Sequence, residues 1–509
     1  MISFRPIWWF YFVTIILLSS FLSVGFFHPD EHFQIIEFAN HLLGRGSEVD
    51  NIWEFSKEIR PWFQPVLVAS ILKVCFEFTN SPFLSIAIVK ICFGTMLFAS
   101  TCLVARNYSR KKGFSDAMQR RLFFSLFLLS PILGFSLGRT SSESFSAACL
   151  GVIVGLILNA SPYQLKNSLK LHATMASLFT MMFFIRYQMA FAYLGIFLWF
   201  QVYVRPKWSV VLTQVFISIA VSLIFIGLDS ALYGHVVLTP WNYFYTNIIE
   251  GAASNFGVSP WYAYLIWPPT NILSIFVLMT NIAAVVLVFS GRYSIFLFIY
   301  LSFLMGHSII AHKELRFLLP VLIIAPALWF DAGRVIFERI SVSLDRSIFL
   351  SKLLIGTLLG LQILEAVSPQ IRSLSDLAKL DLKFRFSNLP ESPCVEWMYE
   401  GKTLQYAGNM FANFYRASDI QIIDRSFIAA GEESIGCKTE TFYQLRRETV
   451  GWYLALPDSA MDNYRCEIDG LVFKSLLSVL SGISLPNMLS EKINSKYAYR
   501  ILKCTKNLK

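Results

Sequence analysis

A dense group of polar residues, HPDEHFQ (28–34), follows the first long apolar run of the sequence. Pro29 predicts the end of the preceding helix, because proline lacks a backbone donor and clashes with the helical turn before it. Asp30 and Glu31 then lie at the membrane surface, next to the position of a lipid headgroup. A helix that starts at Asp30 also brings Gln34 near the same face. The alternative is that Asp30 only caps that helix, since an acid at a helix N-terminus binds free N–H groups.

The turn RTSSE (139–143) joins two apolar runs and carries a further carboxylate, Glu143. The charge pattern of the connecting segments, described below, predicts that this turn lies on the same membrane face as Asp30. Arg139 and Glu143 are therefore candidates for the same site. A helix start of the Ser-x-x-Glu kind is the structural alternative.

The pentapeptide HKELR (312–316) is a third polar turn between two apolar runs. Its two cations, Lys313 and Arg316, fall on the outer face, where positive charge is unusual and needs an anionic partner. A phosphate group suits both side chains. Arg186, in the short connection FFIRYQ (183–188), is a further outer cation. For Arg186 an ordinary structural ion pair is the alternative.

The loop 229–269 is rich in tryptophan and tyrosine. These aromatic residues are Trp241, Tyr243, Tyr245, Trp261, Tyr262, Tyr264 and Trp267. Tyr and Trp favour the membrane interface, so an interfacial belt explains most of them. A flat aromatic wall for a polyprenyl chain or a sugar face is the functional alternative.

The elements that must position these residues are membrane helices. Of the 509 residues, 55% are hydrophobic and 15% are charged, whereas soluble proteins carry about 25% charged residues. This composition excludes a soluble or a disordered chain. The net charge of +10 fits the basic cytoplasmic loops of membrane proteins better than nucleic-acid binding. The sequence has no Walker A or GxGxxG motif, so a nucleotide donor is not expected.

Twelve apolar runs are candidates for membrane spans. They lie at 7–27, 61–78, 83–105, 122–137, 144–160, 172–185, 187–204, 208–228, 270–290, 293–311, 317–333 and 347–366. The first is interpreted as an uncleaved helix and not as a signal peptide, since no A-x-A-like cleavage site follows it.

Basic residues orient these runs, because Lys and Arg concentrate in cytoplasmic loops. The basic clusters fall at 106–121, 166–170, 205–207, 292 and 334–346. With a cytoplasmic N-terminus, this pattern fits if run 61–78, which contains Pro65, Lys73 and Glu77, lies along the outer face without crossing. About eleven crossings then remain. The polar turns described above all face outward.

The composition changes near residue 367. After it, 34 of 143 residues are charged, against 42 of the 366 before it. The sequence therefore predicts a membrane domain at 1–366 and a small soluble α/β domain at 367–509 on the outer side. Strands are expected at 420–424 and 451–457, and helices at 401–416 and 471–483.

Eight cysteines fall in two groups. Cys75, Cys92, Cys102 and Cys149 lie in apolar runs and are expected to pack there. Cys394, Cys437, Cys466 and Cys504 follow residue 367, and they pair in an oxidising compartment or stay reduced and buried. No CxxC or Cys/His spacing indicates zinc. The sequence requires no cofactor or metal, although a divalent cation between the outer carboxylates is chemically allowed.

Five motifs occur in a fixed order along the chain. They are HPDEHFQIIEFA (28–39), NIWEFSKEIRPWFQP (51–65), GRTSSES (138–144), FFIRYQ (183–188) and HKELRFLLP (312–320). Their combination resembles the dolichyl-phosphate-mannose-dependent mannosyltransferases of glycosyltransferase family 22. Within that family the sequence is most similar to the GPI mannosyltransferases, especially the group that adds the third mannose. The resemblance covers residues 1 to about 370.

This resemblance implies an all-α polytopic membrane protein of the GT-C type, with a juxtamembrane helix where run 61–78 does not cross. It implies an inverting transfer of mannose from a lipid phosphate, with the catalytic acid at Asp30 and Glu31 beside it. The residues expected to bind the donor phosphate or the substrates are His28, Gln34, Arg60, Arg139, Glu143, Arg186, His312, Lys313, Glu314 and Arg316.

The function expected is a mannosyltransferase that uses a polyprenyl (dolichyl) phosphate donor and a glycolipid or lipid-linked glycan acceptor, as in GPI-anchor biosynthesis. It would act in the endoplasmic reticulum membrane of a eukaryote or in the cytoplasmic membrane of a bacterium. The alternative is a transporter or flippase of a lipid-linked glycan. That function predicts ionisable residues in mid-membrane and repeated halves. Lys90 lies within a run, but it is expected to extend to the surface along the lipid.

Overall fold

A computed structural model describes residues 6–22, 26, 28–45, 52–79, 81–113, 117–339 and 353–363, together with five strands between residues 394 and 506. The chain divides into two compact units. The first, called the helical unit, comprises residues 1–23, 34–39 and 53–369. The second comprises residues 24–33, 40–52 and 370–509. The sequence did not predict that the segment after the first helix is grouped with the C-terminal region.

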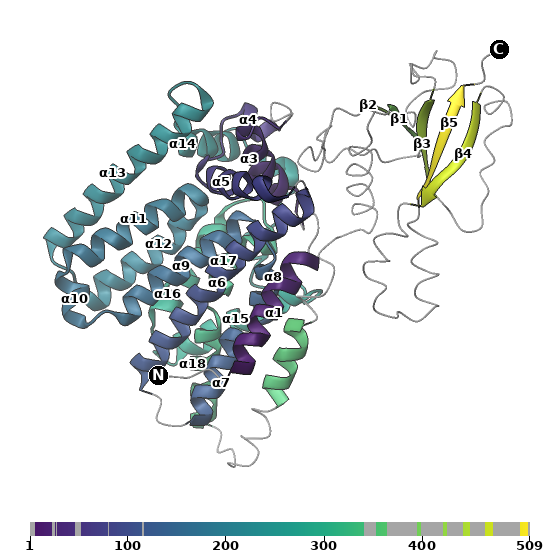
Figure 1. Ribbon diagram of the computed structural model, residues 1–509. Helices are drawn as coiled ribbons and strands as arrows, with labels where there is room; N and C mark the ends of the chain where they lie inside the picture. The colour runs from purple at the N-terminus through teal and green to yellow at the C-terminus, as the bar shows by residue number, and fades with distance from the viewer. Residues whose placement is uncertain are drawn as a thin grey trace. The chain divides into compact units, whose positions relative to one another are not determined.

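The long elements of the helical unit are apolar helices (Figure 1). They are α1 (Pro6–Leu22), α6 (Pro82–Lys112), α7 (Ala117–Leu128), α8 (Pro131–Leu137), α9 (Ser142–Asn159), α11 (Leu169–Ile185), α12 (Ala190–Trp199), α13 (Trp208–Tyr233), α15 (Ile272–Phe289), α16 (Ile295–Ile309), α17 (Leu319–Leu322), α18 (Pro326–Arg339) and a helix at Leu353–Ile363. Shorter helices connect them: α4 (Trp53–Ser56), α5 (Phe63–Phe78), α10 (Pro162–Asn167), η3 (Tyr187–Met189), η4 (Phe200–Val204), α14 (Thr239–Phe244), η5 (Tyr245–Ile249), η6 (Ala252–Phe256) and η7 (Leu315–Leu318).

Six of these helical segments are long and apolar enough to cross a membrane. A seventh is the pair Leu315–Leu322 and Pro326–Glu338, which is bent by 74°. Four shorter apolar helices, Trp9–Phe21, Leu169–Ile185, Ile295–Ile309 and Leu353–Ile363, coincide with the other predicted runs. The chain is therefore a multi-pass helical membrane protein, and the count of eleven crossings stays a prediction.

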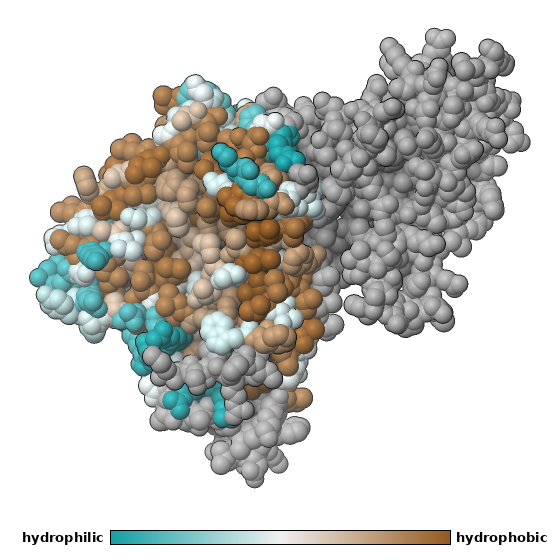
Figure 2. Space-filling view, viewed as in Figure 1, coloured by the Kyte–Doolittle hydropathy of each residue, from teal (hydrophilic) through white to brown (hydrophobic). Residues whose placement is uncertain are grey.

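The exposed faces of the helices are those of a protein in lipid. On α13, Leu212, Phe216 and Leu223 are 66%, 70% and 63% exposed. Figure 2 shows that one face of the helical unit is mostly hydrophobic, with hydrophilic residues gathered toward its two ends. Soluble proteins seldom expose apolar patches of this size, because water contact with them is unfavourable.

Helix α5 is not among the candidate spans of the described chain, as run 61–78 was predicted not to cross. Its start is held by α13, because Asp229 Oδ1 accepts the backbone N–H of Trp62 at 2.8 Å. The other carboxylate oxygen of Asp229 accepts from Thr239 Oγ1 at 2.6 Å. Figure 1 shows α4, α5 and α14 together on one side of the helical unit. We call this side the outer end.

The opposite side, here called the inner end, carries basic turns predicted to be cytoplasmic. Figure 1 shows α10 and the ends of α7 and α18 there. Lys112 Nζ lies 3.0 Å from Asp331 Oδ1, and Lys207 N–H donates to Lys166 O at 3.2 Å. Arg292 pairs with Glu338. Turns that the positive-inside argument assigned to one face therefore meet in pairs.

Two local predictions are wrong. The helix expected to start at Asp30 is α2 (Pro29–Glu31), with His28 as its N-cap, and a π-helix η1 (His32–Ile36) follows before α3 (Glu37–Leu42). Because a π-helix has i→i+5 hydrogen bonds, the spacing of three and four residues does not define one face here. Lys90 in α6 is only 2% exposed, so its side chain is buried in the protein and does not extend along lipid.

Five strands of the second unit form one mixed sheet. They are β1 (Cys394–Met398), β2 (Gln421–Asp424), β3 (Thr441–Arg447), β4 (Tyr464–Leu471) and β5 (Tyr499–Lys506), in the order β2-β1-β3-β5-β4. Strand β1 pairs in parallel with β2 and β3, whereas β5 is antiparallel to β3 and β4. Strand β2 confirms the strand expected at 420–424.

The other elements expected in the C-terminal region fall almost entirely outside the described residues. The predicted strand at 451–457 and helix at 401–416 lie outside the described residues, and of 471–483 only Leu471, the end of β4, is described. The soluble α/β domain therefore stays a prediction. Cys466 and Cys504 are direct partners in the β4–β5 register, and Cys437 lies outside the described residues. The cysteines at 75, 92, 102 and 149 are free.

Candidate active site

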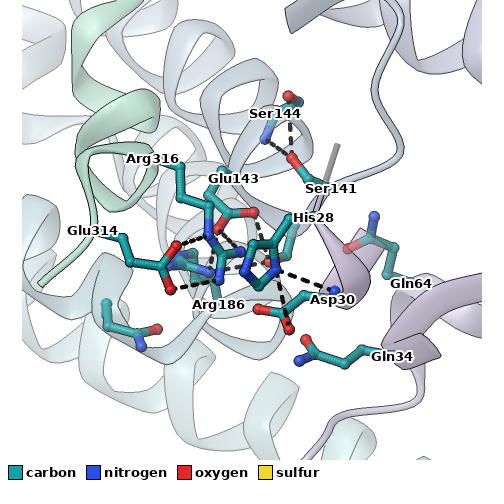
Figure 3. A network of polar contacts seen from close by, with 12 residues as sticks. His28, Asp30, Gln34, Gln64, Ser141, Glu143, Ser144, Arg186, Glu314 and Arg316 are labelled. Carbon is teal, nitrogen blue, oxygen red and sulfur yellow. Dashed lines mark hydrogen bonds and ion pairs between the residues drawn. The ribbon is translucent and has the colours of Figure 1, made fainter. Parts of the chain in front are cut away.

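Three turns at the outer end bring their charged residues into one buried network (Figure 3). Glu143 Oε1 lies 3.0 Å from Arg186 Nη1 and 3.1 Å from Arg316 Nη1. The side chains of Glu143, Arg186 and Arg316 are 3%, 7% and 10% exposed. These contacts confirm the prediction that the turns 139–143, 183–188 and 312–316 share one face of the protein.

The start of α9 positions Glu143. Ser141 is the N-cap, and its hydroxyl accepts the backbone N–H of Ser144 at 3.2 Å. Ser142 Oγ donates to Glu143 Oε2 at 3.4 Å and accepts from Arg186 Nη1 at 3.2 Å. The helix-start interpretation of this turn is thus correct as local structure. The Glu143 carboxylate nevertheless binds arginines and leaves the capping to serine.

Arg316 is held within its own motif by a bidentate carboxylate. Its Nε donates to Glu314 Oε2 at 2.7 Å, and its Nη2 donates to Glu314 Oε1 at 3.1 Å. His312 Nε2 also lies 3.0 Å from Glu314 Oε1. A two-point carboxylate pair fixes the plane of a guanidinium. The HKELR turn therefore orients Arg316 so that Nη1 reaches Glu143.

An aromatic ring lies against both arginines. The guanidinium carbons of Arg186 and Arg316 are 5.1 and 5.0 Å from the centre of the Phe317 ring. A cation over an aromatic face is attracted by the ring quadrupole, more strongly where water is excluded. Phe317 thus stabilises two positive charges that would otherwise repel each other.

Lys313 occupies a different environment from Arg316. Its Nζ donates to the backbone carbonyls of Ser259, at 3.1 Å, and of Ile310. The residue is 5% exposed, and this burial lowers the pKa of its ammonium group below the usual value. Lys313 therefore ties the loop before α15 to the turn after α16, and its contact with a donor phosphate stays a prediction.

Other predicted residues form a second polar group beside α5. Gln34 Nε2 donates to Glu54 Oε1 at 3.0 Å, and Arg60 Nη2 lies 3.7 Å from the same oxygen. Gln64 Nε2 donates to the backbone oxygen of Thr140 at 2.8 Å, which links α5 to the turn that carries Glu143.

Arg139 is packed against helix α8. Its Nε donates to Phe135 O at 3.1 Å, and its guanidinium carbon lies 3.8 Å from the Phe135 ring centre. These contacts hold the turn before α9 in place. The role of Arg139 in substrate binding stays a prediction.

Two of the buried acids for which the sequence predicted no role join separate elements of the outer end. Glu54 is 6% exposed and joins Gln34 to Arg60, and Asp229 is 1% exposed and joins the starts of α5 and α14. Each had a signal in the sequence. Glu54 lies inside the motif at 51–65, and Asp229 directly follows the apolar run 208–228.

The second unit contains the predicted catalytic acid. The Asp30 backbone N–H donates to His28 Nδ1 at 3.3 Å, and Asp30 Oδ1 lies 3.3 Å from the same nitrogen. The Asp30 side chain is 31% exposed, whereas Glu31 is 5% exposed. His32 stacks on Phe26 with ring centres 5.2 Å apart. Of the two adjacent carboxylates, Asp30 is the one accessible to a substrate.

Within the described ranges, no three His, Cys, Asp or Glu side chains are grouped so as to hold a metal ion. Independence from metals stays a prediction.

Solved structures show the fold to which the helical arrangement is similar. ArnT from Cupriavidus metallidurans, in a crystal structure bound to undecaprenyl phosphate, matches with a TM-score of 0.55. The identity is 11%, over 97% of this chain and 98% of that one. The apo form of the same protein matches with a TM-score of 0.52. This likeness supports the expected GT-C fold.

Sequence relatives agree with the motifs. GPI mannosyltransferase 3 from Debaryomyces hansenii is 27% identical over 60% of this chain, and GPI alpha-1,2-mannosyltransferase 3 from Bos taurus is 24% identical over 61%. The match spans 55% and 56% of the length of those relatives. The model of the Alg9-like mannosyltransferase family matches residues 8–379. This match shows that the chain belongs to the Alg9-like mannosyltransferase family, a family of glycosyltransferases, as the motifs predicted.

Proposed function

We propose that this protein transfers mannose from a polyprenyl (dolichyl) phosphate to a hydroxyl of a glycolipid or lipid-linked glycan, with inversion that gives an α-linkage. The names of the relatives support a role in GPI-anchor biosynthesis, and hence the endoplasmic reticulum membrane. ArnT, bound to undecaprenyl phosphate, supports a polyprenyl-linked donor.

The observation that carries this proposal is the pair of buried guanidiniums on one carboxylate oxygen. Burying charges is costly and adds little net stability, so function is the better explanation for retaining them. Arg186 and Arg316 present N–H donors of the kind that binds phosphate oxygens. Glu143 and Glu314 hold these donors in position. Such preorganised positive charge stabilises a phosphate that gains charge as a leaving group.

The proposed reaction is a direct displacement. The acceptor hydroxyl attacks the anomeric carbon from the face opposite the lipid phosphate. The bond from that carbon to the phosphate oxygen breaks, and the phosphate leaves as an anion without needing a general acid. Asp30 takes the hydroxyl proton as general base, a contribution of roughly 10²–10⁴-fold. Its exposure, compared with that of Glu31, supports this choice between the two neighbouring acids.

The substitution Asp30→Asn tests the base. Asparagine has the same size but does not take a proton at neutral pH, and it caps a helix about as well as aspartate. We expect turnover to fall about 10²-fold or more, with folding and donor binding retained. The assay measures mannose transfer from dolichyl- or undecaprenyl-phosphate mannose to glycolipid acceptors in detergent.

Glu31→Gln and Glu143→Gln are the controls, and each should reduce turnover less. Near-normal turnover in Asp30→Asn, with an inactive Glu31→Gln or Glu143→Gln, would show that another carboxylate is the base. Movement of a lipid-linked glycan across vesicles by a wild-type protein that transfers no sugar would favour the transporter alternative.

A further inference from the structure

His307, near the end of α16, is a buried residue that the proposed reaction has not used. It is 2% exposed, and its Nδ1 lies 3.0 Å from Phe303 O, one helical turn earlier. A backbone carbonyl only accepts, so Nδ1 carries the proton and Nε2 has a free lone pair. Among the described residues, this Nε2 is buried and has no hydrogen-bond partner.

Arg186 offers the complementary group. Its Nη1 contacts Glu143 and Ser142, but its Nε–H is buried and has no partner in the described part of the chain. Buried polar atoms are nearly always paired in native proteins, so an unpaired one calls for a specific explanation. Here a buried donor and a buried acceptor both lack a partner.

Both groups lie near the same aromatic ring. Phe317 lies with its ring centre 5.1 Å from the Arg186 guanidinium carbon and 6.3 Å from the centre of the His307 ring. Phe303 and Phe191, with ring centres 4.3 and 5.5 Å away, cover other sides of the imidazole.

Close packing of α12 against α16 fixes the backbone at His307. A Cβ added at Gly306 would lie 2.2 Å from the Phe191 ring, and one at Gly195 would lie 2.5 Å from Phe298 O. Only glycine permits this approach, as in other tightly packed membrane helices. The imidazole therefore has little freedom to turn toward another partner.

We propose that His307 Nε2 and Arg186 Nε–H bind one hydroxyl of the sugar that is transferred. A hydroxyl is the simplest group that both donates, here to Nε2, and accepts, here from Nε–H. A phosphate oxygen does not suit the lone pair of Nε2, and an ammonium group is disfavoured beside Arg186. The inference rests on the proposed function, because the transferred sugar is attached to the phosphate that Arg186 would contact.

The test uses full-length protein in detergent and mannosyl donors that each lack one hydroxyl. Rates are measured with one fixed acceptor for wild type, His307→Phe and His307→Gln. We expect one deoxy donor to reduce kcat/KM of wild type roughly 10-fold, the value of one hydrogen bond. The kcat/KM of His307→Phe should be lower than that of wild type by a similar factor with the natural donor. With that deoxy donor, the two proteins should have the same kcat/KM. His307→Gln should keep part of the discrimination, since its amide oxygen can also accept.

His172 provides a matched control. It is a fully buried histidine in α11, but both of its ring nitrogens are paired, with Leu165 O at 2.7 Å and Gln214 Nε2 at 2.9 Å. His172→Phe should lower the yield of folded protein and leave the pattern across deoxy donors unchanged. A changed pattern in His172→Phe would mean that the readout follows stability, which would overturn the assignment.

Three further outcomes would overturn the inference. If both His307 variants fold and show the wild-type pattern with every deoxy donor, the two atoms bind water only. In a parallel series with one fixed donor and acceptors that each lack one hydroxyl, a loss of discrimination in His307→Phe would assign the hydroxyl to the acceptor. If the wild-type protein transfers no mannose from any donor, the proposed function fails, and that result is distinguishable from both others.

Discussion

The Glu143 network at the outer end and the Arg292–Glu338 pair at the inner end differ in burial. At the outer end, the side chains of Glu143, Arg186 and Arg316 are at most 10% exposed. At the inner end, Arg292 and Glu338 are each 47% exposed. Both ends contain basic turns of similar composition, and the sequence alone separates them only by the face to which they are assigned.

This difference indicates what each group of charges does. Exposed ion pairs contribute about 0–1 kcal/mol, because water and salt screen them. Their bias toward one face fits the rule that orients membrane helices. Buried pairs have lost their hydration, and removing one partner leaves an unpaired charge inside the protein. The exposed Arg292–Glu338 pair therefore suits topology, and the buried Glu143 network suits binding of an anion.

The largest effect should follow Glu143→Ala. This substitution removes the oxygen shared by Arg186 and Arg316, and breaking a buried pair costs about 3–5 kcal/mol. We expect a large loss of thermal stability in detergent, measured as a lower midpoint of unfolding.

Glu338→Ala at the inner end is the matched control, with an expected loss below about 1 kcal/mol. The contrast between the two ends would be broken if both variants unfolded at the same temperature, or if Glu338→Ala were the less stable protein.

A smaller effect is expected from Arg316→Lys. Lysine keeps the positive charge but lacks the planar fork that binds Glu314 at two points. We expect kcat/KM for the donor to fall roughly 10-fold, and further in Arg316→Ala. Steady-state rates against donor concentration provide the measurement. Normal use of the donor by Arg316→Ala would remove this residue from the phosphate site.

The smallest effect on activity is expected from single cysteine substitutions at exposed residues, one at the inner end and one at the outer end. Lys111 in α6 and Val236 after α13 are exposed, and neither belongs to the proposed site. Lys111→Cys and Val236→Cys should react with an impermeant thiol reagent from opposite sides of a sealed membrane. The unmodified chain corrects for its own cysteines. Reaction of both variants from one side would contradict the assigned topology.

Charge and hydropathy were sufficient to predict that the turns at 139–143, 183–188 and 312–316 share one face of the protein. Arg186, Glu143 and Arg316 come from separate connections, with Arg316 and Glu143 173 residues apart. Their common face follows from counting spans, since each apolar helix reverses the side of the next connection. The non-crossing α5 was found by the same argument, because it restored the parity.

Other details of the structure could not be predicted from charge or hydropathy. The Glu314–Arg316 pair depends on an extended backbone at Glu314 (φ −131°, ψ 142°) before η7, which a charged pentapeptide does not specify. The π-helix η1 has no distinctive composition. Asp229 binds Trp62 from 167 residues away, and a lone acid after an apolar run does not indicate its partner. The sequence also gave no reason to associate residues 24–33 with the C-terminal unit.

Glu143, Arg186 and Arg316 are far apart in the sequence, and this separation has a consequence for biosynthesis. On the predicted topology, each arginine is carried across the bilayer during insertion, at a cost of several kcal/mol near the membrane centre. The ribosome delivers Glu143 first, then Arg186, and Arg316 last. In a nascent chain that ends before Arg316, only Arg186 is therefore available to pair with Glu143. Insertion of the hairpin between α16 and α17 completes the network, so the last step of membrane integration also assembles the anion site.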